Sequence, residues 1–376
     1  MSDVVALLQQ LVAIPSVSPM GNPPGRGEGE GEIARALVSR LRAAGFACEV
    51  SEGAPGRPNV VARLAGGDGP ATIFEAHMDT VSAADMVRDP FAASLEHGRL
   101  FGRGACDDKA ALAAMVVALE ETARRGTPPG DIILAATADE EYSGSGVQHL
   151  IDQGLRADGA VVGEPTSLRL VVAHKGAVRL RITTHGLAAH SSEPDKGENA
   201  IYLMAPLIEA LRGYAESLGS RQAHPLVGRP TCSIGTIHGG QAPNIVPSEC
   251  SIVVDRRLLP DEQPEAAEAE VRAWLTQHCP GVAWEMSVML YGIGMDTPVE
   301  APIVGKCADA LDRVLGGHEI AGVQYGTDAS RLSRAGIPSV VLGPGDIAQA
   351  HTADEWVEVA QVEQAVAVYR EIMWPS

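Results

Sequence analysis

The sequence predicts an α/β protein of two domains: a larger domain with a mixed or parallel sheet, and a smaller ferredoxin-like α+β domain inserted into it. Three observations support this prediction. The chain has 376 residues, which is more than one ordinary hydrophobic core supports. Strand and helix patterns alternate over about the first 170 residues, as in α/β sheets with crossover helices. After His174 the strands gain a polar face, and α/β signals resume near the C-terminus.

The elements of the first segment follow from the spacing of its apolar residues. The N-terminus predicts an amphipathic helix, because four apolar residues recur at helical spacing: Val4, Leu7, Leu8 and Leu11. Further helices are expected at 29–44, 109–125 and 145–153, and strands at 58–64, 71–76, 131–138 and 159–163. The last two strands are short, continuous apolar runs, which is typical of parallel strands covered on both faces.

The inserted domain is predicted from a change of period. Val178, Leu180 and Ile182 alternate with polar residues, so this strand has one face in water. A helix at 198–218, strands at 231–238 and 248–258, a helix at 262–278 and a strand at 282–290 follow. This β-α-β-β-α-β order is that of a ferredoxin-like unit. A helix at 301–316 and a strand at 338–342 then return to the first domain, so we expect domain segments 1–176, 177–289 and 290–376.

The composition narrows the class of partner. The 48 acidic and 29 basic residues give a formal net charge of −19, and such a field repels nucleic acid. No apolar run is long enough for a membrane span, so neither nucleic acid nor a membrane is an expected partner. The N-terminus lacks the pattern of a secretory signal, and the six cysteines are scattered. These features favour reduced thiols in the cytoplasm.

Polar side chains stand where several predicted strands end. The carboxyl ends of strands in an open α/β sheet form the edge where ligands bind, so these groups should converge although they are far apart in the sequence. Two aspartates also precede the predicted helix at 109–125, where a carboxylate meets the positive end of the helix dipole. The groups are His77, Asp79, Glu140, Glu141, Glu164 and His351, together with Asp107 and Asp108.

Two histidines and at least three carboxylates around one point suit a pair of divalent metal ions. Carboxylates crowded in one pocket repel one another unless cations compensate them. Each group also has a separate explanation: Asp107 as a helix cap, Glu141 as a surface residue and His77 as a hydrogen-bonded core histidine. Their shared position at strand and helix ends favours the metal pair.

Five segments resemble the motif series of one metallohydrolase family: 75–84 (EAHMDTVSAA), 102–110 (GRGACDDKA), 137–144 (TADEEYSG), 161–168 (VVGEPTSL) and 349–357 (QAHTADEWV). This family contains acetylornithine deacetylases, succinyl-diaminopimelate desuccinylases, aminoacylases and glutamate carboxypeptidases. The similarity extends over essentially the whole chain. The run GEPTSLRLVVAHKG most resembles the acetylornithine deacetylase branch.

The resemblance implies two divalent metal ions, with zinc expected and cobalt or manganese as alternatives. His77, Asp107 and Glu164 would hold one ion, while Asp107, Glu141 and His351 would hold the other, with Asp107 bridging. Asp79 matches the carboxylate that orients His77. Glu140 matches the general base, which takes a proton from water and passes it to the leaving amine. The family pattern also implies a cis peptide bond between Asp107 and Asp108.

The resemblance further implies that 177–289 is a lid and dimerisation domain and that the other two segments are catalytic. His190 matches a histidine that polarises the scissile carbonyl in the partner subunit of a homodimer. Arg257 matches the arginine that grips the substrate carboxylate, and Asn244, Gly326 and Thr327 match residues near the substrate. Each of three residues also has an alternative without a functional role. His190 would then be an ordinary loop histidine, Arg257 a surface arginine in an ion pair and Asn244 a turn asparagine.

The expected function is therefore removal of an N-acyl group from an amino acid, as in acetylornithine deacetylases. The substrate class is a small N-acyl amino acid or a short peptide. A dipeptidase, carboxypeptidase or succinyl-diaminopimelate desuccinylase would use the same machinery. Outside enzymes, the alternative is a catalytically dead relative that binds amino-acid derivatives; loss of the base or of a ligand would mark it, and every expected position is filled here.

Overall fold

The computed structural model describes residues 2–22 and 24–375. They form two compact units. Unit 1 comprises the described residues of Met1–Val172, Thr297–Ala321 and Thr327–Ser376, and unit 2 comprises Ala173–Asp296 and Gly322–Gly326. Unit 2 includes residues 177–289.

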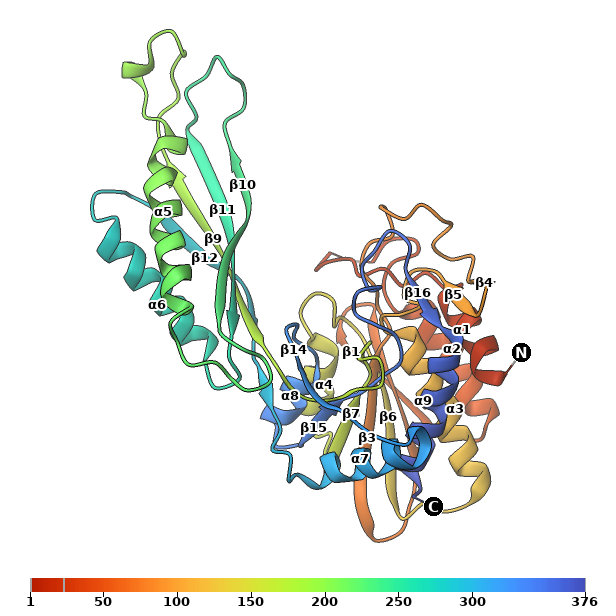
Figure 1. Cartoon of the computed structure of the whole chain (residues 1–376). Helices are drawn as coiled ribbons and strands as arrows, with labels where there is room; N and C mark the ends of the chain where they lie inside the picture. Colours follow the sequence, from red (N-terminus) through yellow and green to blue (C-terminus); the bar gives the residue numbers. More distant parts are fainter. Residues whose placement is uncertain (1, 23, 376) are drawn as a thin grey trace. The chain divides into compact units, whose positions relative to one another are not determined.

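Unit 1 is built on a mixed sheet, as expected (Figure 1). Its strands follow the order β1-β2-β6-β3-β7-β15-β8. β3 pairs in parallel with both β6 and β7, and β7 pairs in parallel with β15, whereas β1–β2 and β2–β6 are antiparallel. The bounds are β1 Cys48–Ala54, β2 Arg57–Leu64, β3 Gly69–His77, β6 Gly130–Thr137, β7 Gly159–Val162, β8 Leu170–His174 and β15 Ser339–Val341.

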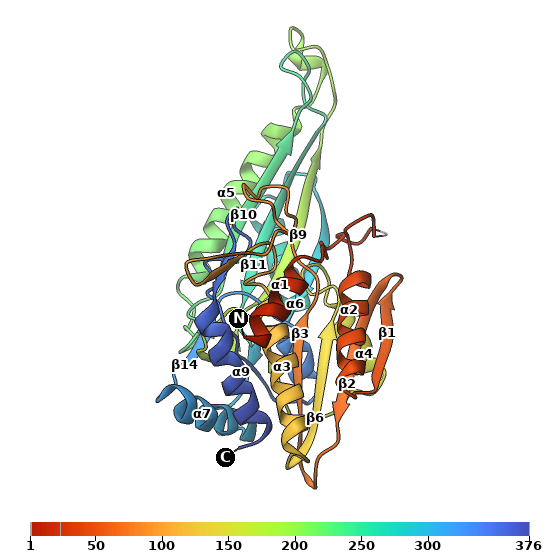
Figure 2. The same ribbon diagram turned by 90° about the vertical axis from the view of Figure 1, so that its right-hand side faces the viewer.

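Helices cover both faces of this sheet. α1 (Asp3–Val12), α3 (Lys109–Arg125) and α9 (Val359–Met373) pack together on one face (Figure 2), while α4 (Ser145–Asp152) and α8 (Ala329–Arg334) lie on the other. Every residue of α3 from Ala110 to Leu119 is buried, because its alanines let the helix pack closely among its neighbours. α2 (Gly31–Ala43) packs on β1 and β2, and α7 (Pro302–Leu315) packs on α9.

A small antiparallel sheet joins two distant segments of unit 1. Its strands lie in the order β16-β5-β4, with β4 Ser94–Glu96, β5 Arg99–Phe101 and β16 Trp356–Glu358. Trp356 pairs with Phe101 and Glu358 with Arg99. The segment before β16 is therefore held beside the segment after β5.

Unit 2 has the predicted ferredoxin-like order. β9 (Gly176–His185), α5 (Ala200–Leu218), β10 (Thr231–Gly239), β11 (Glu249–Leu258), α6 (Pro264–His278) and β12 (Glu285–Gly292) follow one another. The sheet is antiparallel in the order β10-β11-β9-β12. Val178, Leu180 and Ile182 face a core that includes the apolar side of α5 and α6, as the alternation of β9 predicts. Pro264 begins α6 two residues after the expected start, since its fixed φ suits the first helical turn.

Shorter elements complete the two units: η1 (Pro194–Lys196), β13 (Met295–Asp296) and β14 (Ile320–Val323). Among the described residues, no helix combines the length and the apolar character needed to cross a membrane.

Candidate metal centre and active site

The topology of unit 1 explains why distant polar residues meet. β3 lies between β6 and β7 and is parallel to both, so the three strands end at the same edge of the sheet. His77 is the last residue of β3, the pair Glu140–Glu141 follows β6, and Glu164 follows β7. The predicted convergence at the carboxyl edge is present for these residues.

His77 is buried and its two ring nitrogens have separate partners. Nε2 lies 2.9 Å from Oδ1 of Asp107. Nδ1 lies 3.0 Å from the main-chain oxygen of Asp79 and 3.6 Å from its Oδ1. A proton on Nδ1 would be shared with these acceptors, which leaves the lone pair of Nε2 directed at Asp107. The main-chain oxygen of Asp79, rather than its carboxylate, is thus the nearer partner of the ring.

Asp107 faces a second histidine with its other oxygen. Nε2 of His351 lies 3.3 Å from Oδ2 of Asp107 and 3.3 Å from Oε1 of Glu141. His351 has a positive φ of 57°, an uncommon conformation for a residue with a side chain. One carboxylate therefore stands between two imidazoles, in the arrangement that a bridging ligand requires. The Asp107–Asp108 peptide bond is cis, in agreement with the resemblance.

Among the described residues, two groups of side chains bring their potential ligand atoms within 4.8 Å of one another. One consists of His77, Asp107 and Glu141, and the other of His77, Glu140 and Glu164. The geometry thus gathers four of the five expected ligands around His77, whereas His351 lies against Asp107 and Glu141 and belongs to neither group. It also places Glu140 as close to this cluster as the ligands themselves, so position alone does not separate the base from the ligands.

The electrostatics of the cluster favour cations. Burial raises the pKa of Glu140 and Glu164 well above the ordinary carboxyl value, and also raises that of Glu141. Hydrogen bonds to Asp107 and Glu141 raise the pKa of His351 to about 10. Burial acts to raise the pKa of Asp107 as well, but the bonds from His351 and His77 outweigh it and lower that pKa. Carboxylates that share one buried site are stabilised by divalent cations, so this donor set fits a metal pair.

Asp79 supports the loop that carries the two glutamates. Its carboxylate is fully buried and accepts the main-chain N–H of Glu140 at 3.1 Å and that of Glu141 at 3.3 Å. Beneath it, the buried Arg57 lies 3.5 Å from Asp79 and 2.8 Å from Asp139. Asp139 has a positive φ of 68°, and the ion pair with Arg57 helps to hold this uncommon conformation.

Asp108 follows Asp107 directly, across the cis peptide bond. It is fully buried, and neither carboxylate oxygen has a hydrogen-bond partner among the described residues. A Cβ atom at Gly163 would lie 2.7 Å from its Oδ2 and 2.7 Å from Cβ of Ala111. The close approach of Asp108 therefore requires glycine at position 163.

The remaining sequence-predicted residues lie mostly in unit 2. His190 and Asn244 are exposed and lie on two paired loops: Ser191 donates to the Asn244 carbonyl at 3.1 Å. Nδ1 of His190 lies 2.7 Å from the Ser192 hydroxyl. Arg257 donates to Asp255 at 2.7 Å and to the Gln324 carbonyl at 3.4 Å. Gly326 belongs to unit 2 and Thr327 to unit 1.

Lys175 is a further candidate residue, which no motif or spacing in the sequence indicates. It is only 4% exposed, and its ammonium donates to the Arg229 carbonyl at 2.5 Å. Burial, together with Arg257 and Arg256, lowers its pKa. A buried lysine beside two arginines favours an anionic ligand. The one sequence feature that could have indicated Lys175 is its position directly before Gly176, the first residue of β9.

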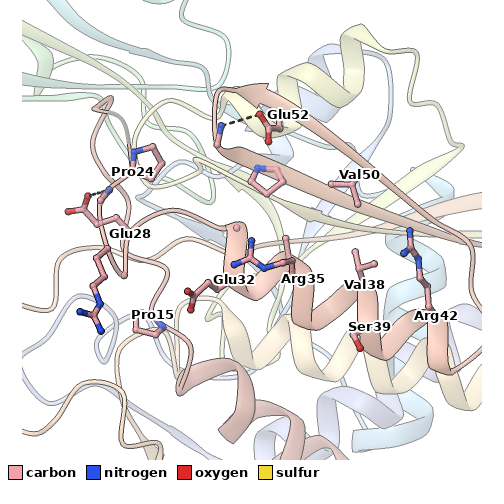
Figure 3. A pocket seen from close by; sticks show the side chains of 17 residues that line it. Pro15, Pro24, Glu28, Glu32, Arg35, Val38, Ser39, Arg42, Val50 and Glu52 are labelled. Atoms are coloured by element: carbon pink, nitrogen blue, oxygen red, sulfur yellow. Dashed lines mark hydrogen bonds between the residues drawn. The ribbon is translucent and has the colours of Figure 1, made fainter.

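A separate hollow of about 1080 Å³ lies in unit 1 between α2 and the β1–β2 hairpin. Figure 3 shows Glu28 toward one end of it, Glu32, Glu52 and Arg35 near the middle, and Arg42 toward the other end, with Val38 nearby. None of the residues that line it belongs to the His77 cluster. Its lining mixes acidic and basic side chains and contains no histidine, so it lacks the donor set of the carboxyl edge.

The chain is similar to known proteins along nearly its whole length. The model of the family described as peptidase family M20/M25/M40 matches residues 73–374. An acetylornithine deacetylase from Myxococcus xanthus is 31% identical over 98% of this chain and 97% of its own. An M20 family metallo-carboxypeptidase from Sulfolobus solfataricus superposes with a TM-score of 0.83 at 20% identity, covering 99% of both chains. A dinuclear metal-binding peptidase from Bacillus subtilis gives a TM-score of 0.71 at 16% identity, covering 98% of this chain and 96% of its own. These two structures share the fold.

Proposed function

The chain belongs to the peptidase family M20/M25/M40, and from that premise we propose that it removes an N-acyl group from an amino acid, as acetylornithine deacetylases do. It is a metal-dependent amidohydrolase. The observation that carries the proposal is the single carboxylate of Asp107 between His77 and His351, at 2.9 and 3.3 Å. A near-full-length relative named acetylornithine deacetylase supports the choice of substrate class.

His77, Asp107 and Glu164 would hold one divalent ion, and Asp107, Glu141 and His351 the other. Zinc is the ion we propose, because imidazole and carboxylate ligands suit it, and cobalt and manganese are the alternatives. When bound, such a pair polarises the scissile carbonyl and lowers the pKa of a water molecule to roughly 7.

Glu140 is the general base of this proposal. Its carboxylate would accept a proton from water and, once protonated, pass that proton to the leaving amine. Asp79 fixes the main chain of Glu140 and Glu141 through two hydrogen bonds. The adjacent side chains cannot share one direction, so the roles of base and ligand divide between them.

Recognition of the substrate falls to the other predicted residues. Arg257 would bind the substrate carboxylate through its planar guanidinium, and Asn244, Gly326 and Thr327 would lie near the substrate. His190 would stabilise the oxyanion of the tetrahedral intermediate. We assign catalysis to 1–176 and 290–376, and the lid and dimerisation role to 177–289.

We propose a homodimer formed through the lid domain. β10 is an edge strand of its sheet, and its exposed Ile237, with Tyr202 of α5 at 77% exposure, offers apolar surface to a partner. Exposed edges and apolar side chains of this kind favour association. All six cysteines are free, which supports a cytoplasmic location.

The experiment that tests this function is a panel of N-acetyl, N-succinyl and dipeptide substrates, with release of free amine as the readout. We expect N-acetyl amino acids to be hydrolysed with the highest kcat/KM, and a chelator to abolish the reaction. Preference for dipeptides would instead assign the chain to the dipeptidase or carboxypeptidase alternative. No hydrolysis by metal-loaded protein would favour the catalytically dead binding protein.

A further inference from the structure

A buried ion pair lies behind the Asp107 loop. Arg103 and Glu355 are each 1% exposed, and Nη1 of Arg103 lies 2.7 Å from Oε2 of Glu355. The other oxygen of Glu355 accepts the main-chain N–H of Cys106 at 2.9 Å and that of Asp107 at 3.1 Å. Glu355 thus contacts the backbone of the residue whose side chain faces both histidines.

The same pair ties two distant segments together. Glu355 follows His351 by four residues and directly precedes β16, which pairs with β5 just before Arg103. Gly102 donates its N–H to the Glu355 main-chain oxygen at 3.1 Å. Arg103 also donates to the Ser82 carbonyl at 3.0 Å, on the chain that leaves His77. Three segments that carry predicted ligands therefore meet at one ion pair.

We propose that Glu355, held by Arg103, is a positioning residue that sets Asp107 between His77 and His351. The inference rests on the proposed function, because Asp107 is the shared metal ligand only there. Glu355 belongs to neither group of potential metal ligands among the described residues; it acts through the amides of Cys106 and Asp107. A charged acceptor makes shorter and stronger bonds to such amides than a neutral one does.

The Glu355 carboxylate contributes both the position of its oxygen atoms and its negative charge, and substitutions can remove the two separately. Glu355→Gln keeps an oxygen that can accept the two amides but removes the counter-charge of Arg103. Glu355→Ala removes both and leaves the buried Arg103 with only the exposed carboxylate of Asp85, 3.2 Å away, as an ionic partner, which is costly. Arg103→Lys keeps the charge and loses the fixed fork of the guanidinium. The three variants therefore separate charge from geometry.

The matched control is Glu358→Gln. Glu358 lies three residues further along on β16 and pairs with Arg99 on β5 at 2.8 Å, with both side chains partly exposed. This variant removes a carboxylate–arginine pair from the same small sheet without touching Asp107.

The test is stepwise binding of Co²⁺ and Zn²⁺ to the full-length protein, by competition with a chromophoric chelator and by the visible spectrum of bound Co²⁺. Loss of an outer hydrogen-bond partner of a ligand typically weakens metal binding by about 10–100-fold. We expect Glu355→Ala to weaken the binding of both Co²⁺ and Zn²⁺ by this factor, and Glu355→Gln and Arg103→Lys to weaken it less. The spectrum of bound Co²⁺ should change in all three variants. Glu358→Gln should bind both ions as the wild type does. Circular dichroism of each variant establishes that it is folded.

If Glu355→Ala does not fold, Glu355→Gln and Arg103→Lys decide the question. Folded variants that bind both ions like the wild type, with an unchanged Co²⁺ spectrum, would overturn the positioning role even if their melting temperature falls. Weakening of equal size in Glu358→Gln would overturn it too. If the wild-type protein takes up no Co²⁺ or Zn²⁺, the metal centre of the proposed function fails first, and the positioning role fails with it.

Discussion

Oδ2 of Asp107 lies 3.3 Å from Nε2 of His351, although the two residues belong to the first and the last sequence segments of unit 1. Oδ1 of the same carboxylate lies 2.9 Å from His77. Asp107 is thus shared between two imidazoles, and every ligand assignment proposed for the site depends on this sharing.

The two adjacent glutamates should respond differently to the loss of charge. Glu140→Gln should lower kcat by orders of magnitude while both metals remain bound, because it removes the base alone. Glu141→Gln should lose affinity for one metal, because Glu141 faces His351 at 3.3 Å. Elemental analysis of the two purified variants decides between these roles. Equal metal content in both would reverse or remove the assignment.

Gly163→Ala should destabilise the protein by about 1–3 kcal/mol, the usual cost of overpacking a dense core. The added methyl group would lie 2.7 Å from both Asp108 Oδ2 and Ala111 Cβ. The matched control is Gly305→Ala within α7, where a Cβ meets nothing within 4 Å; it should be neutral or stabilising, since alanine is the better helix former. Urea unfolding of the two variants measures the difference. A Gly163→Ala protein as stable as the wild type would contradict the packing of Asp108 against this glycine.

His174 should make unit 2 sensitive to acid. Burial lowers the pKa of His174 to about 4, below the value of about 6.5 for the unfolded chain. The unfolded chain therefore binds the proton first as pH falls, so stability is complete above about pH 6.5 and is lost progressively down to about pH 4, by about 3 kcal/mol in total. His174→Gln should flatten the pH dependence of the free energy of unfolding in that window. The control is the exposed His238→Gln, and an unchanged slope in His174→Gln would argue against the buried neutral imidazole.

Mixed dimers test whether His190 acts across subunits. Every predicted metal ligand lies in unit 1, whereas His190 lies in unit 2. Co-expression of His190→Ala with Glu140→Gln should restore about a quarter of wild-type activity, since half of randomly paired dimers are hybrids and each has one complete site. Mass spectrometry establishes that hybrids have formed. Confirmed hybrids without activity would mean that His190 acts within its own subunit or has no catalytic role.

The regular parts of the fold could be read from the sequence because their apolar periods are strong. The ferredoxin-like order of unit 2, the buried strands β6 and β7 and helices α1 and α3 all follow from such periods. β1 was not predicted: its segment CEVSEGA is polar and partly exposed, as suits a strand at the edge of a sheet. The short strands β5 and β16 were also missed, because three residues carry too little pattern.

The site also has residues that the sequence predicts and residues that it does not. His77, Glu140 and Glu164 were placed together by the rule that parallel strands end at one edge. The roles of Arg57, Arg103 and Glu355 could not be predicted, because a buried charge has no periodic signature and is recognised only from its partners. The nearer partner of His77 Nδ1 is the main-chain oxygen of Asp79. Every residue has such an oxygen, so the sequence gives no sign of which one accepts this hydrogen bond.

The most direct test of the account is anomalous diffraction at the zinc edge from crystals of the full-length protein grown with Zn²⁺. The account predicts two peaks on either side of the Asp107 carboxylate, one bound by His77 and Glu164 and the other by Glu141 and His351. A single peak at full occupancy, or two peaks that leave Asp107 unbound, would contradict it.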